Sequence, residues 1–143
     1  MAWVIDGNNV LGQMRVSRDS TESKRQLVRL LGGFARAKRT TVFCYFDGPE
    51  PPAFGRQLGN VRVIFSGRRP ADDLITAKVA EGRDWNVVTS DRTVASRTAG
   101  RRVTVVPARQ FLSQLEAAGL ESGETPDEDW LDYFSDPQNR NAF

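Results

Sequence analysis

Short runs of β-branched and aromatic residues alternate along the chain with longer polar stretches that carry an apolar residue every three or four positions. The first pattern is typical of buried strands, and the second is typical of helices with one apolar face. Their alternation predicts parallel βαβ units and therefore an α/β fold. We predict five strands, at residues 2–6, 41–46, 61–65, 86–90 and 103–106. We predict four helices, at residues 22–38, 72–81, 92–98 and from 107 onward.

The length and the charge distribution indicate one domain followed by a tail. A chain of 143 residues fits a single core. We expect the domain to span residues 1–119, which hold 19 basic and 11 acidic residues, a net charge of +8. Residues 120–143 form an acidic, aromatic-containing tail with one arginine and seven acids, a net charge of −6. The basic domain favours nucleic acid as a partner, although an ordinary solvated surface gives a similar count.

Composition excludes several classes of site. The chain has no histidine, which removes histidine-based triads, paired-histidine ribonuclease chemistry and histidine zinc sites. Its one cysteine, Cys44, lies in an apolar run and is better interpreted as a buried small side chain than as a nucleophile. Neither a membrane-length apolar run nor a signal-like N-terminus is present, so we expect a soluble, cytoplasmic protein that does not bind membranes.

Acids follow the predicted strands at the point where each strand ends. Asp6, Asp47 and Asp91 each come at or just after a strand, and Asp72 and Asp73 open a predicted helix. Because the carboxyl ends of parallel strands lie at one edge of the sheet, these acids are expected to converge in space. Each acid also has a structural explanation, as a helix cap or a turn residue. The joint pattern favours a divalent metal, because carboxylates that share an edge repel one another unless a cation neutralises them.

The oxygen ligands predict Mg²⁺ or Mn²⁺ rather than zinc, and a role in phosphodiester chemistry. We expect Asp6, Asp72 and Asp91 to be metal ligands, directly or through water. Asp73 is either a ligand toward a second metal or a solvent-facing residue, and Asp47 is either a ligand or part of the floor of the site. Asn9, placed at the start of the loop after the first strand, is expected to hold Asp6 or to touch phosphate.

Arginines supply the expected phosphate contacts. We predict that Arg68, Arg69 and Arg92 bind nucleic-acid phosphates beside the acids, with ion pairs inside the cluster as the alternative. A further row lies off the apolar face of the helix at 22–38 and is either solvated, which we prefer, or phosphate-facing; it consists of Arg25, Arg29 and Arg36.

Four motifs together resemble the NYN domains of the PIN-like nuclease superfamily, and most of all their bacterial YacP-type group. The motifs are Asp6-Gly7-Asn8-Asn9, Phe46-Asp47-Gly48, Ala71-Asp72-Asp73-Leu74-Ile75 and Val87-Val88-Thr89-Ser90-Asp91. The resemblance covers about residues 1–118. Asn8 departs from it, because YacP-type sequences commonly have an aromatic residue there.

The resemblance implies a three-layer α/β/α PIN-like sandwich with a central, mainly parallel five-stranded sheet. It also implies a metal-dependent endoribonuclease that cuts single-stranded RNA, with catalytic residues that map onto Asp6, Asn9, Asp72 and Asp91. By analogy with ribosome-associated YacP-type proteins, it implies that the RNA is mRNA on the ribosome. The alternative is a non-catalytic RNA-binding or ribosome-docking module with the same fold. The tail has no counterpart in the resemblance, and we expect it to fold over the basic surface or to dock a partner.

Overall fold

A six-stranded sheet forms the centre of the computed structural model, which describes residues 2–14, 16, 20–82, 84–100 and 102–121. The strands are β1 (Ala2–Asp6), β2 (Val42–Phe46), β3 (Gln57–Leu58), β4 (Val61–Phe65), β5 (Trp85–Val88) and β6 (Val103–Val106). The helices are α1 (Gly7–Gln13), α2 (Thr21–Lys38), α3 (Ala71–Val79), α4 (Arg92–Thr98) and α5 (Ala108–Glu121). The predicted tail, apart from its first two residues, lies outside the described residues.

The strand order is β3-β4-β2-β1-β5-β6, and only β3 runs antiparallel to its neighbour. The chain builds outward from β1 through β2 to β4, and then returns to place β5 and β6 on the other side of β1. The topological switch point therefore lies between β1 and β5, where connections leave toward opposite faces. Ligands in open α/β sheets bind outside the carboxyl ends of the strands at such a point.

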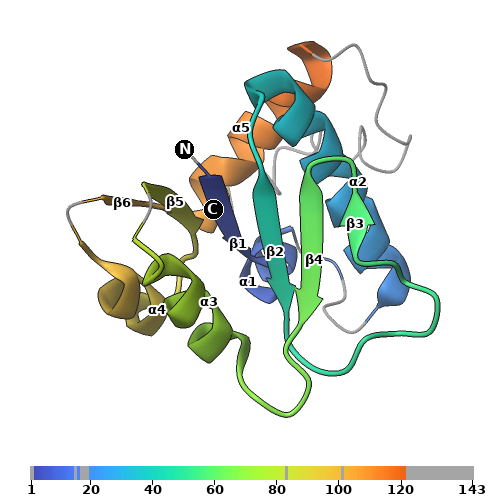
Figure 1. Cartoon of the computed structure of the whole chain (residues 1–143). Coiled ribbons are helices and arrows are strands. Elements are labelled where there is room, and N and C mark those ends of the chain that lie inside the picture. Colours follow the sequence, from blue (N-terminus) through green and yellow to red (C-terminus); the bar gives the residue numbers. More distant parts are fainter. Residues whose placement is uncertain (1, 15, 17–19, 83, 101, 122–143) are drawn as a thin grey trace.

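Helices cover both faces of the sheet and make three layers (Figure 1). On one face α1, α2 and α5 enclose a core in which Trp3, Phe34 and Phe111 form a ring cluster with centroids 4.9–5.5 Å apart. On the other face α3 and α4 cover a smaller core around Trp85 and Ile75. The three-layer α/β/α prediction is thus confirmed. Cys44 is fully buried, and burial raises the pKa of its thiol.

Two elements were missing from the sequence-based prediction. The sheet has six strands rather than five, because the two-residue β3 pairs with β4. The stretch after Asp6 is the helix α1 rather than a loop, so Asn9 lies in a helical turn. Helix α1 buries Val10 and Leu11 but has only seven residues, too few for a clear 3.6-residue period. No helix within the described ranges is long and apolar enough to cross a membrane.

Candidate active site at the carboxyl edge of the sheet

Asp6 is the last residue of β1 and lies at the switch point of the sheet. Only 7% of the residue is exposed. Gly7 allows the backbone to pass close to β2 here, because a Cβ at this position would lie 2.6 Å from the ring of Phe46 and 2.7 Å from the carbonyl oxygen of Tyr45. The sheet and this close approach together hold the Asp6 carboxylate in a fixed, nearly water-free position.

The surroundings of Asp6 oppose its ionisation. Its pKa is raised from the ordinary 3.8 to about 6, mainly because burial removes water from the carboxylate. A hydrogen bond from Thr89 acts in the opposite direction, as does one from the backbone of Asn9. The negative charges of Asp72 and then Asp47 raise the pKa further, which places both acids within electrostatic range of Asp6. A cation at this point would relieve both the burial cost and the repulsion.

The two asparagines after Asp6 tie α1 to the strands on either side of β1. Asn8 Oδ1 accepts a hydrogen bond of 2.9 Å from the backbone N–H of Asp47, just beyond β2. Asn9 Oδ1 accepts one of 2.7 Å from the backbone N–H of Ser90, just beyond β5. The Ser90 hydroxyl oxygen in turn accepts from the N–H of Ala108, the first residue of α5. The asparagine pair therefore fixes the loops that carry the acids.

Asp47 caps a helix that begins 24 residues later. Its Oδ1 accepts a hydrogen bond of 2.8 Å from the N–H of Ala71, the first residue of α3. The helix has no cap of its own, since Pro70 precedes it. Asp47 thus positions the first turn of α3, and with it Asp72, relative to β2.

Asp91 and Asp73 are both engaged with groups of the protein. Asp91 is the N-cap of α4, where its Oδ1 accepts from the N–H groups of Thr93 at 2.8 Å and Val94 at 3.2 Å. This confirms the capping interpretation for Asp91. Asp73 accepts a hydrogen bond of 3.1 Å from Arg97. The second carboxylate oxygen of Asp91 takes no hydrogen bond within the described chain.

The acids therefore converge on one edge without forming a closed cage. In the described part of the chain, no three Asp, Glu, Cys or His side chains make a group that could hold a metal ion. The residues that fit a cation are Asp6 and Asp72, with Asp91 available through its free oxygen. This donor set suits Mg²⁺, which is usually held by one or two carboxylates while water and substrate phosphate fill the remaining positions.

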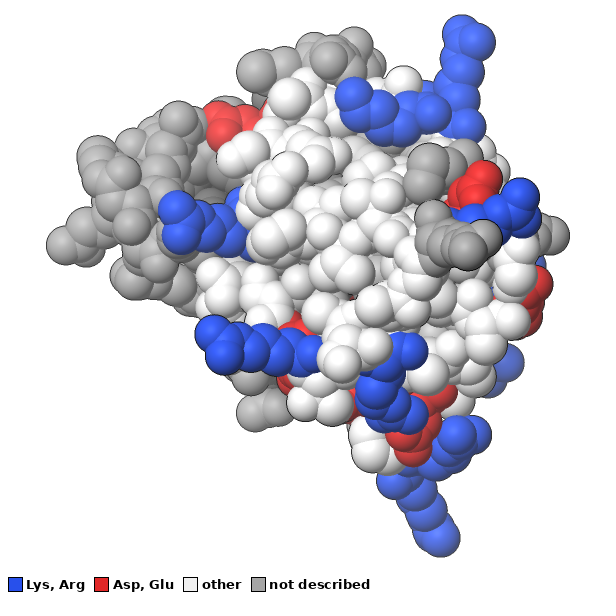
Figure 2. All heavy atoms as spheres, turned by 90° about the vertical axis from the view of Figure 1, so that its left-hand side faces the viewer, with Lys and Arg blue, Asp and Glu red and all other residues white. Residues whose placement is uncertain are grey.

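Arginines lie around the same edge. Arg68 and Arg69 follow β4 in a loop that is joined to the loop after β2, where the N–H of Gly67 donates to the carbonyl oxygen of Gly48 at 2.8 Å. Both arginines are exposed, as is Arg92 in the first turn of α4. Within the described ranges none of the three pairs with an acid. Figure 2, seen from the side of α3 and α4, shows basic side chains around the rim of this face and beside acids at its lower edge.

Sequence reasoning missed the supporting residues of the site. Thr89 donates a hydrogen bond to Asp6, and Asn8 accepts one from the Asp47 loop, yet neither was assigned a role. A hydroxyl residue two positions before an acid at a strand end was the available signal for Thr89. For Asn8 the one sequence signal was its place beside Asn9, because the residue it contacts is 39 positions away.

Comparisons with known proteins agree with this fold. The model of the YacP-like NYN domain family matches residues 3–130. The crystal structure of Rae1 (YacP) from Bacillus subtilis is similar at a TM-score of 0.69 and 20% identity, covering 84% of this chain and 76% of that one. A tryptophan-to-leucine variant of Rae1 is similar at a TM-score of 0.68 and 19% identity, covering 99% and 97%. No curated protein matches this chain by sequence. The chain therefore belongs to the YacP-like NYN domain family.

Proposed function

We propose that this protein is a divalent-metal-dependent endoribonuclease that hydrolyses phosphodiester bonds of single-stranded RNA. The observation that carries the proposal is the buried carboxylate of Asp6 at the switch point, whose pKa is raised to about 6 mainly by burial and further by the negative charges of Asp72 and Asp47. Within the described chain Asp6 has no basic partner. A buried carboxylate without a basic partner does not stabilise a fold, whereas a metal site requires one.

Asp6 and Asp72 would hold the cation, and Asp91 would reach it directly or through water. When bound, a divalent cation lowers the pKa of a water ligand and stabilises the charge that develops on the scissile phosphate. Thr89 keeps the Asp6 carboxylate in one orientation through its 3.0 Å hydrogen bond. Asn9 is neutral and holds the loop that carries Asp91, so it positions an acid without adding a charge. Asp47 acts in the same way on Asp72 through the first turn of α3.

RNA is the proposed substrate because the domain is basic and its acid edge is surrounded by exposed arginines. Residues 1–119 carry a net charge of +8 despite the acids at the site. The guanidinium groups of Arg68, Arg69 and Arg92 would bind phosphate oxygens that the carboxylates alone would repel. Membership in the YacP-like NYN family supports the same substrate class. An encounter with mRNA on the ribosome is part of the proposal through that resemblance.

One observation favours a second candidate, a non-catalytic RNA-binding module. Asp47, Asp73 and Asp91 are each used to cap a helix or to pair with an arginine, which leaves Asp6 and Asp72 as the two predicted ligands that do neither within the described chain. A protein that only binds RNA would need the arginines and the fold. It would show no dependence on Asp6 for chemistry.

A cleavage assay separates the two candidates. Wild-type protein is incubated with a mixed-sequence single-stranded RNA in Mg²⁺, Mn²⁺ or EDTA, beside Asp6→Asn and Asp72→Asn. Asp84→Asn is the matched control, because Asp84 is an exposed acid that precedes β5 at the opposite edge and pairs with Arg102. We expect internal cuts that require metal, persist in the control and disappear in the two site variants. Intact RNA under every condition, together with RNA binding, would instead support the binding module.

A further inference from the structure

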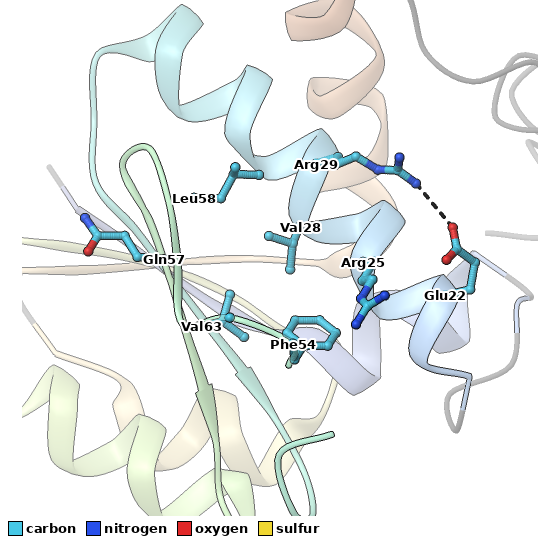
Figure 3. Close-up of a pocket in the computed structure, with 9 residues that line it drawn as sticks. Glu22, Arg25, Val28, Arg29, Phe54, Gln57, Leu58 and Val63 are labelled. Atoms are coloured by element: carbon cyan, nitrogen blue, oxygen red, sulfur yellow. Dashed lines mark hydrogen bonds and ion pairs between the residues drawn. The ribbon is translucent and has the colours of Figure 1, made fainter. Parts of the chain in front are cut away.

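A groove of about 370 Å³ lies between α2 and the β3–β4 hairpin (Figure 3). Val28, Leu58 and Val63 line it with aliphatic carbon, and Phe54 adds an aromatic ring. Leu58 is the exposed large apolar side chain of the described chain, at 45%. The groove is thus open and has an apolar wall, with charged and polar side chains along the rest of its lining.

The groove also carries positive charge. Arg29 pairs with Glu22 at 3.3 Å, so these two rim residues largely neutralise each other. Arg25 has no acidic partner within the described residues, and its guanidinium lies 5.5 Å from the centroid of the Phe54 ring. An arginine over an aromatic ring, beside an aliphatic wall, is a surface on which a nucleobase can stack.

A chain of ring contacts leads from this groove to the acid edge. Phe54 packs edge-on against Phe65 at 5.0 Å and against Phe46 at 6.4 Å, and these are the last residues of β4 and β2. The Phe46 ring fills the space above Gly7, directly after Asp6. The ring cluster at the ends of β2 and β4 therefore lies between the groove and the residue that follows Asp6.

Lys24 supplies a second cation along this path. The residue is 8% exposed, and its Nζ lies 5.9 Å from the ring centroids of both Phe46 and Phe65. Within the described chain no acid pairs with it. An ammonium group held over these rings, between the groove and the strand ends, is suited to a phosphate of a strand that runs from one to the other.

We propose that this groove binds one unpaired nucleobase of the single-stranded RNA, next to the nucleotides at the acid edge. The base stacks on Phe54 and the Arg25 guanidinium against the wall formed by Leu58, while Lys24 contacts the backbone between the groove and Asp6. Bases in a duplex are stacked on their neighbours, so the groove selects unpaired RNA. This inference rests on the proposed function for its substrate, and it makes Arg25 an RNA-facing residue rather than part of the solvated row that we preferred from the sequence.

The test measures RNA binding in the Asp6→Asn background, so that cleavage does not interfere. The first probe is a short fluorescent single-stranded RNA. The further probes are copies of it in which one nucleotide at a time lacks its nucleobase. Phe54→Leu keeps an apolar side chain against Phe46 and Phe65 but removes the stacking face. Arg25→Gln removes the groove cation. Arg36→Gln is the control, since this exposed arginine lies on α2 about 16 Å further along the helix axis.

We expect Phe54→Leu to weaken binding by about 5- to 150-fold, the range seen when one stacked base loses its aromatic partner. Arg25→Gln should weaken it more than Arg36→Gln. One base-free copy should bind less tightly than the others to the parent protein, and that difference should vanish in Phe54→Leu. Thermal unfolding of each variant shows that the fold is kept.

The proposal that the groove binds a base would be overturned by equal RNA affinities for Phe54→Leu, Arg25→Gln and Arg36→Gln, together with no sensitive base position. If wild-type protein still cuts RNA with metal, that result leaves the nuclease proposal intact. A sensitive base that depends on Phe54, in a protein that cuts nothing, would keep the groove and refute the nuclease. Absence of any RNA binding would refute both.

Discussion

The hydroxyl of Thr89 donates a hydrogen bond of 3.0 Å to Oδ2 of Asp6, joining two residues that are 83 positions apart in the sequence. The same hydroxyl oxygen accepts a hydrogen bond of 3.0 Å from the backbone N–H of Asp91. Thr89 is 2% exposed, and its own N–H donates to Val106 in β6. One buried side chain therefore connects the acid of β1 to the acid that caps α4, across the switch point.

Thr89→Val should reduce cleavage more than it reduces stability. The variant keeps the shape of the side chain but removes the hydrogen bond that orients Asp6 and the acceptor for Asp91. Loss of a partner that orients a metal ligand typically costs 10- to 100-fold in affinity or activity, and we expect a loss of about that size. Thr89→Ser keeps the hydroxyl and should retain most activity. Cleavage rates over a range of Mn²⁺ concentrations measure the effect, and equal rates for valine and threonine would contradict it.

Asn9→Ala should impair cleavage more than Asn8→Ala does. Asn9 holds the loop that carries Asp91, whereas Asn8 holds the loop of Asp47, whose carboxylate is already committed to capping α3. Each substitution leaves one backbone N–H without its acceptor, so we expect both to lower the free energy of unfolding by about 1 kcal/mol. Denaturant unfolding and single-turnover cleavage of the pair give the comparison. Equal activity losses would mean that Asn9 acts only on stability.

Two substitutions at Asp47 separate the effect of its negative charge from the effect of its cap on α3. Asp47→Asn keeps an oxygen that can accept from Ala71, so the unfolding free energy should change little. Asp47→Ala removes the cap and should cost about 1 kcal/mol. Cleavage by Asp47→Asn then reports whether the negative charge matters to the reaction. Because Asp47 raises the pKa of Asp6, the asparagine variant should also shift the acidic limb of the pH–rate profile to lower pH.

The raised pKa of Asp6 predicts how the free energy of unfolding depends on pH. The folded-state pKa, about 6, lies above the ordinary 3.8, so the folded protein holds this proton more tightly than the unfolded chain does. The resulting stabilisation is complete below pH 3.8, declines as the pH rises toward 6, and is absent above it. In EDTA, Asp6→Asn should therefore exceed wild type in unfolding free energy at pH 7.5, by on the order of 3 kcal/mol. Urea titrations at pH 4.5 and 7.5 measure this gap, and a gap that does not grow with pH would contradict the burial argument.

The sequence was sufficient for the framework of the fold. The apolar runs gave all five longer strands within two residues of their ends, and the helical period of Leu27, Leu31 and Phe34 located α2. The rule that parallel strands share a carboxyl edge placed Asp6, Asp47 and Asp91 on one side of the sheet. These features are local or topological, so they leave a signal in a single sequence.

The partners of each acid were beyond such reasoning. Asp47 caps α3 and Asp73 meets Arg97 through contacts that span 24 residues each, and both depend on how the helices pack on the sheet. Helix α1 is seven residues long and β3 has two, so neither carries a full period of its pattern. For Thr89 the one sequence signal was its place two positions before Asp91, and this does not reveal its partner, because a buried hydroxyl is recognised by what it contacts.

Binding of Mn²⁺ tests most directly the claim that Asp6 and Asp72 form a cation site. Free Mn²⁺ is followed by electron paramagnetic resonance while wild-type protein, Asp6→Asn, Asp72→Asn and the control Asp84→Asn are titrated. We predict that wild type and the control bind Mn²⁺ with the same affinity and that each site variant binds at least about tenfold more weakly, as expected when one carboxylate is lost from the ion's few protein ligands. Equal binding by all four proteins, or none by wild type, would contradict the account.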